Sequence, residues 1–293
     1  MSDTDDMRGR TCMVTGATSG HGRAVAAQLA GRGADLVLLG RNPEKCAALR
    51  DEIGGIAGRA PDILLCDLSS LSDVRRAAAE FLAGGRPLHL LVNNAGQVNE
   101  RYRESVDGYE ETFAVNYLAM FTLTLLLVGR IRESAPARIV NVSSDTHAIA
   151  RIDLDDVTGR SRRYGLLSAY GRSKLAIVYF TRELAARLAG SGVTVNAVDP
   201  GPVASGIAKK GSLLAKAADA IIQLTFPKPD RAARTAMHLA TSPELAGESG
   251  GYWRFMKKKE PALSPDPAFG ARLWEITARM TGVDFAPKKV LTP

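Results

Sequence analysis

The amino-acid sequence predicts a single-domain, doubly wound α/β fold in which a parallel sheet of about seven strands carries helices on both faces. Short apolar runs alternate with longer segments of helical period along the 293 residues. Such alternation is typical of parallel strands, because each needs a crossover connection and right-handed crossovers place helices over the sheet. The runs are nearly continuous in Val, Ile and Leu, as in strands buried on both faces. No Pro- or Gly-rich linker interrupts the pattern, which predicts one domain over residues 1–293.

The expected elements follow one another in regular order. The run TCMVT at residues 11–15 is the first strand and precedes a helix over about residues 22–32. The run ADLVLL at 34–39 is the second strand and precedes a helix near residues 44–53. Each later run follows a helix-length segment, and these strands are DILLC at 62–66, LHLLVN at 88–93, ARIVNV at 137–142 and VTVNAV at 193–198.

Composition and charge limit the classes of function. With 45% hydrophobic and 24% charged residues, the chain has the composition of a globular protein and not of a disordered one. Lys and Arg number 38 against 31 Asp and Glu, which suits a phosphate-bearing ligand. The basic residues are spread along the sequence, so we expect no nucleic-acid partner. The densest runs, at 257–259 and 288–289, are interpreted as solvated surface.

Cysteine, histidine and hydropathy patterns indicate a cytoplasmic protein. Neither the three cysteines nor the four histidines are spaced as metal ligands or disulfide partners, so we expect no metal site. The start, MSDTDDMRGR, is acidic and polar, unlike a secretory signal. No run of about eighteen apolar residues occurs, so we expect no transmembrane segment.

A glycine-rich turn follows the first strand and opens a helix, in the sequence TGATSGHG at residues 15–22. In that context backbone N–H groups reach a pyrophosphate at the helix N-terminus, as in Rossmann-type folds. Gly16 would make the tight turn, Gly20 would admit the phosphates and Gly22 would permit close helix packing. The spacing differs from the G-x-G-x-x-G fingerprint, so a glycine-rich turn without function stays an alternative.

The end of the second strand bears on the choice between NADP and NAD. A carboxylate there would bind the ribose hydroxyls of NAD, but the strand ends in Gly40, Arg41 and Asn42, with Asp35 at its other end. The guanidinium of Arg41 offers a planar fork to a 2′-phosphate, and Arg23 could add a second positive charge. Both could instead be surface arginines, but NADP(H) is favoured over NAD(H).

Two further strand ends carry candidate cofactor contacts. Asp67 and Leu68 follow the third strand, where the carboxylate would accept from the adenine amino group or cap the helix beginning near Ser70. Asn94, Ala95 and Gly96 end the fourth strand, where small residues let a flat cofactor approach the backbone. A simple turn is the alternative for this second group.

The most informative residues are Ser144 at the end of the fifth strand, and Tyr170 and Lys174, four residues apart on one helical face. Tyrosine has an ordinary pKa of about 10 and transfers protons poorly until a nearby ammonium stabilises its phenolate. Lys174 would supply that charge, Ser144 would hydrogen-bond the substrate oxygen, and Asn116 could hold a water that links Lys174 to solvent. A surface Tyr and Lys pair has the same spacing.

Taken together, these motifs resemble the short-chain dehydrogenase/reductase family. The matching segments are TGATSGHG at 15–22, NNAG at 93–96, Asn116, VSS at 142–144, YGRSK at 170–174 and PG at 200–201, in the family's order. The resemblance covers about residues 10–255 and implies catalytic Asn116, Ser144, Tyr170 and Lys174. It also implies dinucleotide contacts from Gly16, Thr18, Ser19, Gly20, His21, Gly22, Arg41, Asn42, Asp67, Leu68, Asn94, Ala95, Gly96, Tyr170, Lys174, Pro200, Gly201, Val203 and Ser205.

The resemblance extends to the retinol-dehydrogenase-like branch through FTRELAARL at 180–188, SPELAGESGGYW at 242–253 and RLWEITARMTGV at 272–283. It implies an alcohol or carbonyl on a small, largely apolar substrate, and a homodimer or homotetramer built through helices around 108–132 and 165–189. We expect this chain to lack the N-terminal anchor of membrane-bound relatives. His21 departs from the aliphatic residue usual in the family, which puts the packing beside the pyrophosphate in doubt.

The segment after Pro200 mixes lysines with apolar residues over 206–226, and we expect a substrate lid at about 205–230. An interfacial helix that makes peripheral membrane contact, or a plain packed helix, are the alternatives. Residues 256–293 are expected to form a C-terminal extension. The sequence thus predicts an NADP-dependent ketone or aldehyde reductase, with a catalytically silent NADP(H)-binding regulator on the same fold as the alternative.

Overall fold

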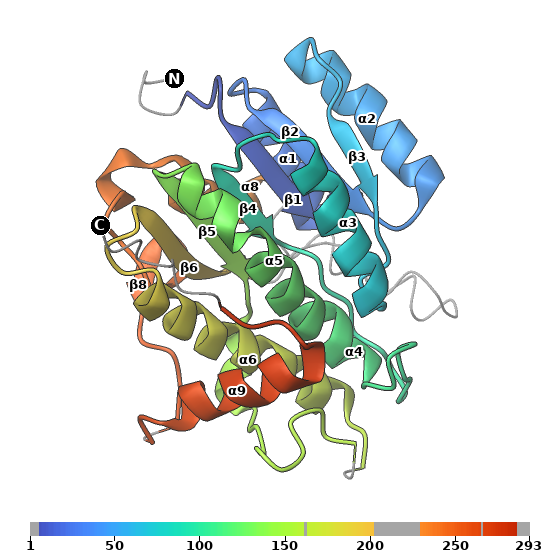
Figure 1. Ribbon diagram of the computed structural model, residues 1–293, viewed down its shortest axis with the longest axis vertical. Coiled ribbons are helices and arrows are strands. Elements are labelled where there is room, and N and C mark those ends of the chain that lie inside the picture. The colour runs from blue at the N-terminus through green and yellow to red at the C-terminus, as the bar shows by residue number, and fades with distance from the viewer. Residues whose placement is uncertain (1–5, 161–162, 202–228, 265, 286–293) are drawn as a thin grey trace, which may run out of the picture.

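An eight-stranded sheet forms the centre of the protein, in the order β3-β2-β1-β4-β5-β6-β7-β8 (Figure 1). The computed structural model describes residues 6–160, 163–201, 229–264 and 266–285. Strands β1 to β7 pair in parallel, which confirms the predicted doubly wound class. The strands are β1 (Thr11–Thr15), β2 (Asp35–Gly40), β3 (Asp62–Leu65), β4 (Leu90–Asn93), β5 (Ala137–Val142), β6 (Val193–Asp199), β7 (Tyr252–Arg254) and β8 (Lys257–Lys259).

The last strand corrects the expectation of about seven parallel strands. β8 is antiparallel to β7, and the turn between them consists of Phe255 and Met256, with φ of 50° and 59°. So short a connection can join only antiparallel strands, because parallel neighbours need a crossover. All three lysines of β8 are exposed, as expected for this run, and lysines on an edge strand oppose further pairing.

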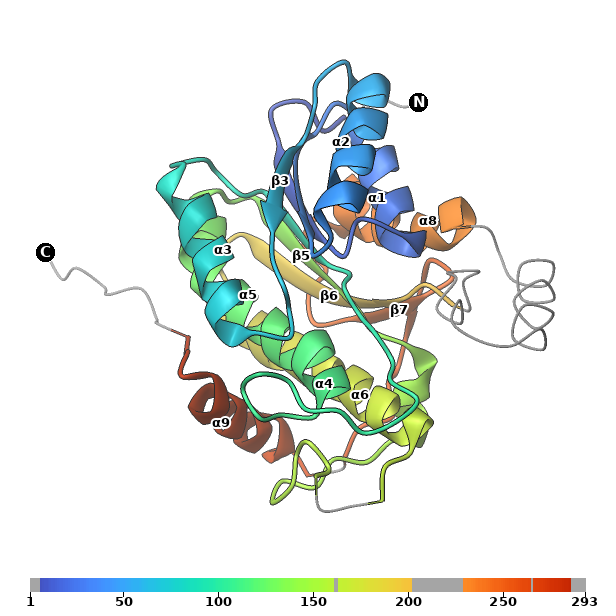
Figure 2. The same cartoon turned by 90° about the vertical axis from the view of Figure 1, so that its right-hand side faces the viewer.

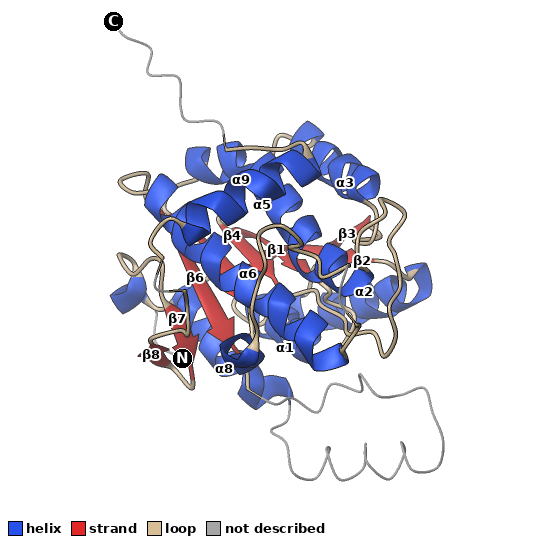
Figure 3. Cartoon of the chain, turned by 90° about the horizontal axis from the view of Figure 1, so that it is seen from below, coloured by secondary structure: helices blue, strands red, loops and turns tan. Residues whose placement is uncertain are grey.

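Helices cover both faces of the sheet (Figures 2 and 3). α3, α5, α6 and α9 contribute to one apolar core, and α1, α2 and α8 contribute to the other. Met13 of β1 belongs to the first core and its neighbours Cys12 and Val14 belong to the second, because successive strand residues point to opposite faces. The helices are α1 (Gly20–Ala30), α2 (Pro43–Ala57), α3 (Leu71–Ala83), α4 (Glu111–Phe113), a π-helical turn (Ala114–Leu118), α5 (Ala119–Glu133), α6 (Leu166–Arg187), α8 (Pro229–Thr241) and α9 (Phe269–Thr281).

The expected C-terminal extension contributes α9 to the core. Trp274 is 3% exposed and stacks on Phe180 of α6, with 5.4 Å between ring centroids and an interplanar angle of 7°. The guanidinium carbon of Arg187 lies 4.0 Å from the Trp274 ring centroid. The expected lid at about 205–230 falls almost entirely outside the described residues.

One helical stretch, Glu111–Glu133, is long and apolar enough to cross a membrane by composition. However, 89% of its most apolar window is buried inside the protein, as in the core helix of a globular fold. The sequence predicts no transmembrane segment because it has no unbroken apolar run of about eighteen residues, and this absence stays a prediction.

The connectivity places a crevice above the middle of the sheet. From β1 the chain builds β2 and β3 on one side, then returns to place β4 on the other side of β1. The loops after β1 and β4 therefore leave the carboxyl edge of the sheet in opposite directions. In open α/β sheets, ligands bind at such a switch point.

Candidate active site

A cavity of about 700 Å³ lies at the carboxyl edge of the sheet. The loops that follow β1 to β6, the start of α6 and the end of β7 all contribute to its wall. Most residues predicted from the sequence to form the site line this one cavity. They are Gly16, Thr18, Ser19, Gly20, His21, Gly22, Arg41, Asp67, Leu68, Asn94, Ala95, Gly96, Ser144, Tyr170, Lys174, Pro200 and Gly201.

The glycine turn forms a cradle that tolerates no side chains at two positions. Gly16 has a φ of 64°, and a Cβ there would lie 2.7 Å from the Cα of Ala95. A Cβ on Gly22 would lie 2.2 Å from the amide nitrogen of Asn94. Gly20 also has a positive φ, of 52°. The glycines thus bring the first turn against the loop after β4, as the predicted phosphate site requires.

The N-terminus of α1 opens toward the cavity. Ser19 is its N-cap, but the Ser19 side chain makes no capping hydrogen bond to the described residues, and the first turn holds no acidic residue. Free N–H groups and the helix dipole at such an end suit an anion. Together with the side-chain-free cradle, this end fits the pyrophosphate of a dinucleotide.

His21 packs tightly at this turn, although the sequence put its packing in doubt. It is 7% exposed, and its Nδ1 lies 2.9 Å from Oδ1 of Asn94. The Asn94 amide nitrogen donates to the carbonyls of Thr15 and Gly16, so its Oδ1 accepts and His21 Nδ1 carries the proton. Burial lowers the pKa of His21, which keeps the ring neutral. His21 therefore ties α1 to the end of β4.

The residues after β2 and β3 bear on the choice of cofactor. Arg41 lines the cavity with an exposed side chain, and its guanidinium lies 3.8 Å from the Asp67 carboxylate. Arg23 does not line the cavity, and its guanidinium pairs with Glu52 at 2.7 Å. Asn42 also lies outside the lining, because its side chain caps α2 by accepting from the N–H of Lys45.

Asp67 lies in the cavity wall and does not cap the following helix. Its Oδ1 accepts from the N–H and hydroxyl of Ser69. Ser70 is the N-cap of α3 and accepts from the N–H of Asp73. The sequence left two roles for Asp67, an adenine contact and a helix cap. The structure rules out the helix cap, and the adenine contact stays a prediction.

Asn116 lies behind the cavity wall in the π-helical turn, a feature common at functional sites. It is 1% exposed, accepts from the N–H of Gln97 and donates to the Gln97 carbonyl and to Ser173 Oγ. A Cβ on Gly96 would lie 3.5 Å from the Asn116 oxygen. Asn116 thus holds the loop after β4 close to α6.

Ser144 follows β5, which ends at Val142, and lines the cavity beside Tyr170. Its hydroxyl hydrogen-bonds the Tyr170 side chain, and its carbonyl accepts from Nδ1 of His147 at 2.9 Å. Nε2 of His147 accepts from the N–H of Ala262, so both ring nitrogens are used in one neutral tautomer. His147 therefore positions the Ser144 loop from behind the cavity wall.

Tyr170 and Lys174 lie together, as the helical spacing predicts. Lys174 Nζ is 5.4 Å from the Tyr170 ring centroid and donates to the Val142 carbonyl at 2.9 Å. Burial lowers the pKa of Lys174 from 10.5 to about 8, although attraction to Asp199 opposes the shift. Lys174 is 2% exposed, and its ammonium is held by the end of β5 and by the charge of Asp199.

The pKa of Tyr170 differs from the sequence-based expectation of a phenol made acidic by Lys174. Burial and repulsion by Asp199 raise it from 10.0 to about 12, and the hydrogen bond to Ser144 opposes this increase. The groups of the chain itself therefore keep Tyr170 protonated at neutral pH. A protonated phenol in this position can act as a general acid.

Sequence reasoning missed several residues of the wall. Asp145 and Asp199 adjoin the predicted Ser144 and Pro200, so their positions beside motif residues were an available signal. Arg254 has no such signal, because β7 brings it in from a distant part of the chain. The apolar lining includes Val98, Val115, Leu166 and Leu167. Val203 and Ser205 lie outside the described residues.

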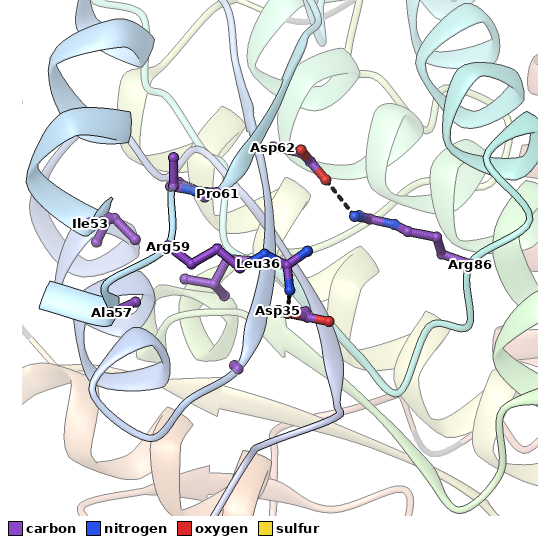
Figure 4. Close-up of a pocket in the computed structure, with 10 residues that line it drawn as sticks. Asp35, Leu36, Ile53, Ala57, Arg59, Pro61, Asp62 and Arg86 are labelled. Carbon is purple, nitrogen blue, oxygen red and sulfur yellow. Dashed lines mark hydrogen bonds and ion pairs between the residues drawn. The ribbon is translucent and has the colours of Figure 1, made fainter. Parts of the chain in front are cut away.

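A second hollow lies at the opposite ends of β2 and β3 (Figure 4). Ion pairs between Arg59 and Asp35 and between Arg86 and Asp62 close it. Its volume of about 10 Å³ holds about one water molecule. Within the described ranges, no group of three or more His, Cys, Asp or Glu side chains is arranged to hold a metal ion. The large cavity is therefore the candidate active site.

Doubly wound enzymes that use nicotinamide cofactors combine a phosphate cradle with a proton-transferring side chain in one crevice, and the chain has both. The family model for short chain dehydrogenases matches residues 10–213. Human retinol dehydrogenase 13 is 39% identical over 94% of this chain and 86% of its own length. Mouse polyprenol dehydrogenase is 39% identical over 94% of this chain and 84% of its own length.

Solved structures are also similar to this chain. A crystal structure of an uncharacterised protein from Mycobacterium paratuberculosis matches with a TM-score of 0.76 and 31% identity, over 97% of this chain and 98% of that one. The Pseudomonas aeruginosa RhlG/NADP active-site complex matches with a TM-score of 0.71 and 27% identity, over 87% of this chain and 98% of that one. The chain belongs to the short-chain dehydrogenase/reductase family, in its retinol-dehydrogenase-like branch, and is an oxidoreductase.

Proposed function

We propose that the protein transfers a hydride between NADP(H) and the alcohol or carbonyl carbon of a largely apolar substrate, acting as a ketone or aldehyde reductase. The observation that carries this proposal is that Ser144, Tyr170 and Lys174 line the same cavity as the glycine cradle. A raised pKa of about 12 on Tyr170 supports the reductive direction, because that direction needs a proton donor.

Each side chain has a separate task in this scheme. Nicotinamide, when bound, supplies the hydride for reduction. Ser144 hydrogen-bonds the substrate carbonyl oxygen and holds it beside the phenol of Tyr170. Tyr170 donates its proton to that oxygen as negative charge develops on it. Lys174 would hold the ribose hydroxyls with the N–H donors not used by Val142, and its positive charge favours the phenolate left behind.

Arg41 supports NADP as the cofactor. It lines the cavity after β2, where the chain has no carboxylate to bind the ribose hydroxyls of NAD. Its exposed guanidinium can turn from Asp67 to a 2′-phosphate, because an exposed pair at 3.8 Å is weak. Two similar solved structures are described as complexes with NADP.

An apolar substrate is supported by the cavity wall and by the relatives. Val98, Val115, Leu166 and Leu167 line the cavity that Tyr170 faces. Burying a large apolar molecule against such side chains is favourable by about 25 cal/mol per Å². The named activities of the similar proteins concern retinol and polyprenol, which are both largely apolar alcohols.

A panel of apolar ketones, aldehydes and secondary alcohols, assayed with NADPH and with NADH, tests the proposal. We expect carbonyl reduction with NADPH to be the fastest reaction. Binding of NADPH, followed by its fluorescence, without turnover of any panel member would instead favour a silent regulator. Faster turnover with NADH would overturn the assignment of Arg41.

Tyr170→Phe tests the proton donor. We expect the variant to bind NADPH as the wild type does and to lose turnover by roughly 10²- to 10⁴-fold, the usual contribution of a general acid. Tyr102→Phe is the control, because Tyr102 lies outside the cavity and its hydroxyl donates to Glu104. Full activity of Y170F would refute the assignment.

A further inference from the structure

Three charged residues of the cavity wall have no task in the proposed reaction. Asp145 follows Ser144, Asp199 ends β6 and Arg254 ends β7. The parallel register pairs Asp199 with Arg254, so the two side chains start from the same level of the sheet. Three separate elements therefore bring opposite charges together at the edge of the site.

The Asp199 carboxylate joins the loops around it. Its Oδ1 accepts from the N–H of Gly201 at 2.8 Å, and its Oδ2 accepts from the N–H of Asp145 at 3.2 Å. The same Oδ2 lies 3.1 Å from Nε of Arg254. Asp199 is 3% exposed, so its charge is poorly screened by solvent.

Arg254 bridges Asp199 to a second carboxylate. Its guanidinium also pairs with Oδ2 of Asp145, and Oδ1 of Asp145 accepts from the hydroxyl of Tyr252 at 2.7 Å. Asp145 directly follows Ser144 in the chain. The bridge from β7 thus fixes the backbone beside the hydroxyl that hydrogen-bonds Tyr170.

Charged and titratable groups approach the Tyr170 phenol from several elements. Lys174 lies on the same helix, Asp199 acts from β6, and Tyr252 from β7 interacts with Tyr170 electrostatically. His21 of α1 is neutral, and the positive charge of Lys174 contributes to lowering its pKa. Among the residues that the structure describes, Asp145 and Arg254 also line the cavity here, and Arg41 and Asp67 line it after β2 and β3.

The two negative charges of Asp145 and Asp199 are balanced by the two positive charges of Lys174 and Arg254. Asp199 repels a phenolate on Tyr170 and attracts the ammonium of Lys174. Without Arg254, the cavity wall here would hold two carboxylates, of Asp145 and Asp199, against the one ammonium of Lys174. With it, each negative charge has a positive partner near the site where the proton is transferred.

We propose that Arg254 is a positioning residue that neutralises Asp145 and Asp199 beside Tyr170 and holds the loop that carries Ser144. It acts through these carboxylates and not by contact with the reacting atoms. This inference rests on the proposed function, in which Tyr170 exchanges a proton with the substrate oxygen.

The pH dependence of alcohol oxidation tests the electrostatic part. The rising limb of kcat/KM reports the apparent pKa of the coupled Tyr170 and Lys174 pair. We expect Arg254→Gln to shift this limb up by about one pH unit, because an uncompensated negative charge disfavours the phenolate. Asp199→Asn removes a negative charge and is expected to shift it down by a similar amount.

Two controls separate electrostatics from a merely structural role. Arg254→Lys keeps the charge and is expected to restore the wild-type limb. Lys258→Gln removes a cation on β8 that pairs with Glu248 at 2.8 Å and lies outside the cavity. We expect this variant to leave the limb of kcat/KM where it is in the wild type. Unchanged limbs in R254Q and D199N, or shifts in the same direction, would overturn the proposal. If R254Q does not fold, a wild-type limb in R254K together with a downward shift in D199N supports the proposal, and a shifted limb in R254K or an unchanged limb in D199N overturns it.

A measurement without substrate distinguishes failure of this inference from failure of the proposed function. Titration of Tyr170 is followed as the phenolate absorbance difference between each protein and its Y170F counterpart. If no panel substrate turns over, but this titration moves up in R254Q and down in D199N, the proposed function fails and the inference stands. If turnover is found and the titration is unchanged in both variants, the inference fails alone.

Discussion

Lys174→Met tests whether the protein keeps an ammonium group buried at neutral pH. In the folded chain, burial lowers the pKa of Lys174 from 10.5 to about 8 despite the attraction of Asp199. The unfolded chain holds the same proton up to the ordinary pKa of lysine. Between these two values the unfolded state binds more protons than the folded state. Wild-type stability therefore rises with pH through this window, as the cost of the buried charge is relieved.

The size of this effect follows from the pKa difference. One pKa unit corresponds to about 1.4 kcal/mol. Of the shift from 10.5 to about 8, the larger part is recovered between pH 7 and pH 10, which amounts to about 2 kcal/mol. K174M has no charge at this position, so its free energy of unfolding does not rise in this way with pH. It also loses the hydrogen bond to Val142, at a cost of about 1 kcal/mol that does not vary with pH.

Urea unfolding at several pH values measures the effect. From pH 7 to pH 10 we expect the free energy of unfolding of the wild type to gain about 2 kcal/mol relative to K174M. Lys45→Met is the control, because Lys45 is exposed on α2 and its removal leaves the pH dependence as in the wild type. Parallel pH dependences of K174M and the wild type would refute the argument that Lys174 is buried as a charge.

Three further variants test the cofactor site and the core. Arg41→Gln is expected to raise the KM for NADPH by roughly ten- to a hundredfold and to leave the KM for NADH unchanged. Arg23→Gln is the control and is expected to change neither KM. Equal effects of R41Q on both cofactors would contradict the role of Arg41. Gly22→Ala is expected to weaken NADPH binding, measured by fluorescence, and to lower the melting temperature, because its Cβ would lie 2.2 Å from an amide nitrogen. The matched Gly31→Ala places its Cβ no closer than 3.6 Å to any neighbour and is expected to leave both unchanged. Trp274→Ala is expected to cost about 3–5 kcal/mol in urea unfolding, and a loss below about 1 kcal/mol would show that α9 is not part of the core.

The parts of the site that could be predicted are those where neighbours in sequence are neighbours in space. The glycine turn at 15–22 is one strand-to-helix connection, and its backbone positions follow from the steric freedom of glycine. Tyr170 and Lys174 share one helical face because four residues make about one turn. Local geometry is sufficient for both arrangements.

The sign of the Tyr170 pKa shift could not be predicted in this way. The sequence pattern places a cation near the phenol, but burial and Asp199 raise the pKa of Tyr170 to about 12 against the opposing hydrogen bond to Ser144. Burial depends on every element around the cavity, and Asp199 arrives from β6. The pKa of Tyr170 therefore depends on contacts between segments that are far apart in sequence.

Periodicity and motif spacing were enough to establish the parallel sheet, the two helical layers and the positions of Ser144, Tyr170 and Lys174 at one edge. They did not establish the antiparallel β8, the tautomers of His21 and His147, or the arrival of Arg254 between two carboxylates. Strand order and register bring these groups together, and both result from packing the whole chain. The sequence determines which side chain stands at each position, whereas the charge state of that side chain depends on the groups that the fold brings next to it.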